Sequence, residues 1–262
     1  MISWKSLVIV AAVVVLSAAF YNPYLSQASF EDDYQGFLKT YDNYRSAQSN
    51  YVTTRNQYLQ YGTLNSKNDA LSAVKTFLVA RDDVLLSHIS LIKGRNADTT
   101  YNSLLDNTVS FLQDHKSRVP AVGSLDDAVK ISQEVESKDS NLQSTSRKVV
   151  GSLLVAKVDG LKLQFLVLEN NAQDLITKLK NNGKNVEVQE RWLLDAKNKR
   201  LLIEDKLLQA RTKINNLQDS NADSINAAYN EIQTTVFEAN QYLREGMQFI
   251  NELAQSIKYG NF

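Results

Sequence analysis

Apolar side chains recur at alternating steps of three and four residues through most of the chain after residue 29. This spacing is typical of helices whose apolar stripes face partner helices, and no stretch sustains the period of two that marks a strand. The pattern predicts an all-α fold, with an N-terminal transmembrane or signal helix followed by six long antiparallel helices. The six helices are expected at about residues 30–61, 66–93, 101–119, 124–181, 186–217 and 225–257.

The expected ends of these helices carry local signals. Gly62 and Gly94 stand where a left-handed C-terminal cap belongs, and Ser66 is expected to cap the helix that follows Gly62. Pro120 interrupts the chain, and Ser124 with Asp127 three residues later forms a capping box. The expected connections of about five residues make neighbouring helices antiparallel.

The helix expected at 124–181 is weak at residues 139–146, which are rich in poor helix formers. It is therefore either continuous or kinked near 140–147. The pattern divides the chain into a membrane anchor or signal segment at 1–28, a four-helix bundle at 29–146 and a spectrin-like three-helix bundle at 147–262. One elongated bundle is the alternative.

The N-terminal segment is apolar from Leu7 to Phe20 except for Ser17, and Lys5 precedes it. The positive-inside rule then keeps the N-terminus in the cytoplasm and places the rest outside it. Residues 7–24, flanked by interfacial aromatics, predict contact with the membrane as a single-pass anchor. The alternative is a signal peptide cleaved near Ala28, which would release a secreted protein.

Composition removes several classes of function. The chain has 262 residues, 29 basic and 29 acidic side chains, two His and no Cys. Balanced charge provides no field to attract nucleic acid, so no nucleic-acid partner is expected. The absence of Cys excludes thiolate chemistry and zinc–thiolate sites, and no metal or other cofactor is expected. The absence of any Asn-x-Ser/Thr sequence favours a bacterial envelope protein.

The most distinctive local feature is a row of tyrosines on the first expected helix after the membrane segment. An antiparallel hairpin turning near Gly62 places this row against Arg81 and His88 of the next helix. The residues predicted to form a polar layer, or a site for a small polar or aromatic ligand, are Tyr41, Tyr44, Gln48, Tyr51, Arg81 and His88. The simpler interpretation is that they hydrogen-bond one another and fix the register of the two helices.

Other polar groups indicate solvated helix faces. Asp82 and Asp83 are adjacent and therefore point about 100° apart on a helix. The alternating charges of residues 184–213 predict a salt-bridged outer face. The chain contains no nucleophile elbow or phosphate-binding loop, and enzymatic activity is not expected.

The leading expectation is a non-enzymatic, membrane-tethered extracytoplasmic protein that acts as an envelope scaffold, spacer or protein-interaction surface. Its expected partner is another protein or envelope component. The alternative is an extracytoplasmic ligand-binding sensor module that works through a separate signalling partner. A helical effector that inserts into membranes is the least favoured, because no second long apolar segment is present.

Overall fold

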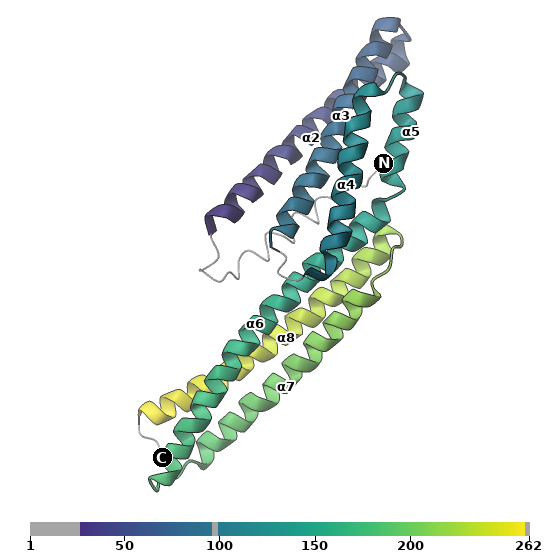
Figure 1. The fold of residues 1–262 in the computed structure, drawn as a ribbon. Helices are drawn as coiled ribbons and strands as arrows, with labels where there is room; N and C mark the ends of the chain where they lie inside the picture. Colours follow the sequence, from purple (N-terminus) through teal and green to yellow (C-terminus); the bar gives the residue numbers. More distant parts are fainter. Residues whose placement is uncertain (1–26, 96–98, 260–262) are drawn as a thin grey trace. The chain divides into compact units, whose positions relative to one another are not determined.

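The computed structural model describes residues 27–95 and 99–259 of the chain. Within these residues the protein is entirely helical, with no strand, as the spacing of apolar residues predicted. Its elements are α2 (Gln27–Tyr61), α3 (Leu64–Lys93), η1 (Thr99–Tyr101), α4 (Asn102–Arg118), η2 (Val119–Ala121), α5 (Leu125–Glu136), α6 (Asp139–Asn181), α7 (Glu187–Asn216) and α8 (Ala222–Lys258) (Figure 1). None of the described helices is long and apolar enough to cross a bilayer, and residues 7–24 lie outside the described part.

The chain divides into two compact units. The first comprises residues up to Val150 together with Asp219–Ala222, and the second comprises Gly151–Gln218 with Asp223–Phe262. The boundary falls inside α6, between Val150 and Gly151.

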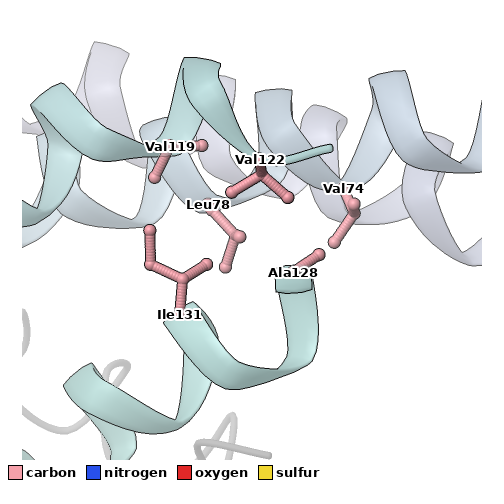
Figure 2. Close-up of a cluster of buried hydrophobic side chains, with 6 residues drawn as sticks. All are labelled: Val74, Leu78, Val119, Val122, Ala128 and Ile131. Carbon is pink, nitrogen blue, oxygen red and sulfur yellow. The ribbon is translucent and has the colours of Figure 1, made fainter. Parts of the chain in front are cut away.

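In the first unit α3 is the central helix. It packs against α2 along most of its length and also against α4, η2 and α5 (Figure 1). A cluster of buried apolar side chains lies between α3 and α5. Figure 2 shows this cluster, formed by Val74 and Leu78 of α3, Val119 and Val122 from the η2 region, and Ala128 and Ile131 of α5.

The helix ends differ in part from the expected ones. Gly62 is left-handed, with φ of +60°, as predicted for the cap after α2. The prediction for Gly94 was wrong, because its φ is −61° and its amide continues the right-handed turn. Ser66 is not the cap of α3 either: the Thr63 hydroxyl accepts from the Ser66 amide at 3.1 Å, so the helix starts one turn earlier.

The break in the helix expected at 124–181 lies at residues 137–138, earlier than predicted. The weak stretch after Asp139 is helical because contacts at its side chains compensate for its poor helix propensity. Ser144 is buried and bonds the Asp219 carboxylate, and the Asn141 amide donates to the same carboxylate at 2.8 Å. These bonds hold the start of α6 against the connection between α7 and α8.

In the second unit α6, α7 and α8 pack against one another, and ion pairs join them. Arg200 of α7 bonds Glu169 of α6 at 2.9 Å, and Lys199 and Lys206 of α7 pair with Glu245 and Glu238 of α8 at 2.6 Å. Glu169 is 1% exposed, so its pair with Arg200 belongs to the helix interface rather than to a solvated face. The sequence-based prediction that the charges of residues 184–213 lie on an outer face was therefore wrong for Arg200.

Gly246 of α8 marks a close approach to α6 in this unit. A Cβ at this position would lie 2.7 Å from Cζ of Phe165 on α6, and Phe165 is only 1% exposed. Gly246→Ala is expected to lower the free energy of unfolding by about 1–3 kcal/mol, because overpacking outweighs the gain of about 1 kcal/mol in helix propensity. Urea unfolding followed by circular dichroism measures this change.

Gly160 provides the matched control on α6. A Cβ there meets no heavy atom within 4 Å. Gly160→Ala is therefore expected to stabilise the protein by about 0.5–1 kcal/mol. Equal effects of the two substitutions would show that Gly246 and Phe165 are not in close contact in solution.

Candidate functional site

A cavity of about 560 Å³ lies in the first unit, between α2, α3 and α5. Helix α2 contributes Tyr44, Gln48, Tyr51, Val52, Arg55, Tyr58 and Leu59; α3 contributes Ala70, Val74, Phe77, Leu78 and Arg81; and α5 contributes Leu125, Ala128, Val129, Ser132, Gln133 and Glu136. Its volume lies in the range of about 300–1,000 Å³ that is typical of small-molecule sites. The walls are mainly apolar and aromatic, and a few polar groups reach them.

Four of the six residues predicted for the polar layer line this cavity: Tyr44, Gln48, Tyr51 and Arg81. The hairpin between α2 and α3 brings them together, because Tyr61 ends one helix and Leu64 begins the next. Sequence reasoning missed the third wall, which α5 supplies. The spacing along α5 indicates a helix but does not show which neighbour its half-buried Ser132 faces.

The other two predicted residues lie outside the cavity lining. The ring of Tyr41 lies 6.3 Å from that of Phe37 and 6.5 Å from that of Tyr44, within the α2–α3 interface. His88 is 7% exposed and its ring lies 6.0 Å from the Phe37 ring. Phe37, the aromatic neighbour of His88, precedes Tyr41, the neighbour expected for it, by four residues on α2.

Three aromatic rings form one wall of the cavity. The rings of Tyr51 and Phe77 are stacked at 5.5 Å with an angle of 10° between their planes. Tyr44 lies 5.5 Å from the same Phe77 ring, tilted by 32°. Burial raises the pKa of the Tyr44 hydroxyl, although the Arg81 charge opposes that rise, so this tyrosine is neutral at pH 7. The wall thus offers a flat apolar surface with hydroxyl groups near its edges.

Comparison with models of protein families, with curated proteins and with solved structures finds no match for this chain.

Arg81 is the most deeply buried of the charged residues that line the cavity. Its side chain is 3% exposed, and Nη1 donates to the Ser132 hydroxyl at 3.1 Å. Burial lowers the pKa of the Arg81 guanidinium, while the charges of Asp82 and Glu136 oppose that change. An arginine remains protonated through such a shift, so the cavity holds a buried positive charge.

Asp82 and His115 form a buried pair behind Arg81. Both side chains are 0% exposed, Nδ1 of His115 lies 2.6 Å from Oδ2 of Asp82, and Nε2 lies 2.8 Å from the Ile131 carbonyl oxygen. Both ring nitrogens face acceptors, so both donate and the imidazole is cationic. Burial by itself would lower the pKa of His115, but the bonds to Asp82 and Ile131 outweigh it and raise that pKa.

The interpretation of Asp82 as part of a solvated face was therefore wrong. The angle of about 100° between adjacent helix positions does separate Asp82 from Asp83. Only Asp83 lies partly in solvent, where it bonds Lys116 at 2.5 Å. One signal was present in the sequence. Asp82 follows Leu78 by four residues and precedes Ile89 by seven, which marks a second buried stripe on a helix that packs against neighbours on two sides.

The described residues contain no group of three His, Asp or Glu side chains that could hold a metal ion. A second hollow of about 270 Å³ lies near the start of α5. Its charged groups are already paired, because Arg118 bonds Glu134 at 2.5 Å and Asp127 caps the helix with Ser124. The α2–α3–α5 cavity is the stronger candidate site, because Arg81 retains hydrogen-bonding capacity there.

Proposed function

We propose that this protein is a non-enzymatic, extracytoplasmic module that binds a small organic ligand between α2, α3 and α5 and works through a separate signalling partner. The observation that carries this proposal is the cavity of about 560 Å³ with stacked aromatic rings on one wall and the buried Arg81 at its base. The proposal includes a tether at residues 7–24 and places the described helices outside the cytoplasm. It also includes the prediction that residues 29–146 form a four-helix bundle and residues 147–262 a three-helix bundle.

The proposal predicts that a small molecule stabilises the folded protein. A compound present at about 100 times its dissociation constant adds about 2.7 kcal/mol to the free energy of unfolding and raises the melting temperature. Thermal unfolding of the full-length chain against a panel of small organic acids, amides, amines and aromatic compounds is the test. If no compound raises the melting temperature in a concentration-dependent way, the proposal is wrong.

A matched pair of variants locates the binding. Gln48 lines the cavity and is half-buried, whereas Asn50 is on the exposed side of the same helix. Gln48→Trp is expected to fill the cavity and abolish the thermal shift. Asn50→Trp is expected to leave it unchanged. A shift that survives Gln48→Trp would place the bound compound elsewhere.

A second candidate function is the scaffold or protein-interaction surface expected from the sequence. It is favoured by three leucines spaced seven residues apart on α7, Leu194, Leu201 and Leu208, which are 58%, 56% and 62% exposed. A row of leucines at this spacing is typical of a helix that pairs with another helix. Crosslinking in intact envelopes tests it: specific adducts lost in Leu201→Glu support a partner, and a protein that emerges alone contradicts it.

The tether itself is tested by the N-terminus of the mature protein. An anchored chain keeps residues 7–24, whereas cleavage near Ala28 would leave a secreted chain without them. Mass spectrometry of the purified protein distinguishes the two.

A further inference from the structure

The base of the cavity holds a buried cation with unused hydrogen-bond donors. Of the three nitrogens of the Arg81 guanidinium, only Nη1 has a hydrogen-bond acceptor, the Ser132 hydroxyl at 3.1 Å. Nε and Nη2 are buried and have no partner among the described residues. A buried charged donor without an acceptor costs free energy comparable to a lost charged hydrogen bond. Such a group can take a hydrogen-bond acceptor that the described residues do not supply.

The neighbouring carboxylate does not fill this role. Oδ1 of Asp82 is 3.8 Å from Nε of Arg81, beyond hydrogen-bond distance, and Oδ2 is engaged by His115 at 2.6 Å. Because His115 donates from both ring nitrogens, it carries a positive charge. Glu136, whose charge also acts on Arg81, accepts from the Ser132 hydroxyl at 3.1 Å and so leaves Nε and Nη2 of Arg81 without an acceptor. A ligand oxygen at this edge of Arg81 would supply the missing acceptor.

The vacant donors select the shape of that anion. Nε and Nη2 lie on the same edge of the planar guanidinium, and two parallel donors at this spacing match the two oxygens of a carboxylate. The lining includes two further charged groups, Arg55 and Glu136, and the Glu136 charge acts on Arg81. Nε and Nη2 of Arg81 are the donors of this residue that remain for a ligand.

The apolar walls of the cavity favour a ligand with an apolar body. The stacked Tyr51 and Phe77 rings face a space also lined by the apolar Val74 and Ala128. Flat apolar walls favour aromatic or aliphatic groups over a bare inorganic ion, because burying apolar area is favourable at about 25 cal/mol per Å². A free phosphate or sulfate would leave most of the cavity without contacts.

We infer that the cavity binds an organic carboxylate with an aromatic or aliphatic body, whose two oxygens accept from Nε and Nη2 of Arg81 while the body packs against Tyr51 and Phe77. This inference rests on the proposed ligand-binding function and names the chemical class of the ligand. Ser132 holds the opposite edge of the guanidinium and so orients the vacant edge.

The test compares acids with amides of nearly the same shape. Phenylacetate and indole-3-acetate are titrated into the full-length chain by calorimetry, beside phenylacetamide and indole-3-acetamide. The acids are expected to bind at least about tenfold more tightly than their amides, because only the acids pair a charge with Arg81. Arg81→Met is expected to remove this difference. Lys67→Gln, which removes an exposed charge of α3 outside the lining, is expected to preserve it.

The possible outcomes separate this inference from the proposed function. Amides that bind as tightly as the acids would overturn the carboxylate assignment and leave small-ligand binding intact. Failure of these four probes and of the wider panel to bind would overturn both. If Arg81→Met does not fold, the acid–amide comparison on the natural chain decides alone, since it requires no variant.

Discussion

Replacing Asp82 by alanine is expected to lower the free energy of unfolding of the first unit by about 3–5 kcal/mol at pH 7. The Asp82 carboxylate is fully buried and accepts from Nδ1 of His115 at 2.6 Å. Its removal leaves the His115 cation without a counter-charge, and that imidazole must then lose a proton or remain unpaired in the core. Urea unfolding by circular dichroism, with hydrogen exchange of peptides from α3, α4 and α5, measures the loss in this unit.

The neighbouring carboxylate supplies the control. Asp83 and Lys116 are 38% and 39% exposed, so Asp83→Ala is expected to cost less than about 1 kcal/mol. Replacing both Asp82 and His115 by leucine is expected to cost less than the sum of the two single replacements, because neither charge is then left alone. Similar losses for Asp82→Ala and Asp83→Ala would contradict the burial of the Asp82–His115 pair.

The helical part of the fold could be predicted because it depends on local patterns. Apolar spacing identified the helices, and the left-handed Gly62 fixed the hairpin between α2 and α3. That short connection limits how far one helix can slide along the other. For this reason the sequence alone was enough to predict that Tyr44, Gln48, Tyr51 and Arg81 share one interface.

The remaining parts of the site depend on contacts between distant segments. The Asp82–His115 pair joins residues 33 positions apart, and Ser132 reaches Arg81 across 51. The rotation of α4 and α5 about their own axes decides these pairings, and no local signal determines it. The start of α6 is a similar case, since Asp219 holds Asn141 and Ser144 in a helix that their propensities disfavour.

His88 is expected to make the protein less stable as the pH falls from about 7 to 4. It is buried, its two ring nitrogens have no hydrogen-bond partner among the described residues, and Arg147 lies near enough to repel its charged form. Burial and this repulsion lower the pKa of His88 from 6.5 to about 4. The unfolded chain therefore takes up the proton first, and the stabilisation present above pH 6.5 is lost as the pH falls towards 4. The full loss is about 3 kcal/mol, since each pKa unit corresponds to about 1.4 kcal/mol.

Replacing His88 by leucine isolates this effect, because the leucine keeps an apolar contact with Phe37 and has no proton to bind. Urea unfolding at several pH values is expected to show that His88→Leu loses less stability between pH 7 and 4 than the natural chain. His115, the only other histidine in the sequence, works in the opposite direction. Its pKa is raised in the folded state, so its contribution is present below pH 6.5 and declines as the pH rises through the folded pKa. The pH dependence of the free energy of unfolding of the natural chain is therefore the sum of these two opposing histidine contributions and the contribution of the carboxylates. Only the difference between the natural chain and His88→Leu tests the burial of His88, and parallel pH profiles would show that the imidazole reaches water.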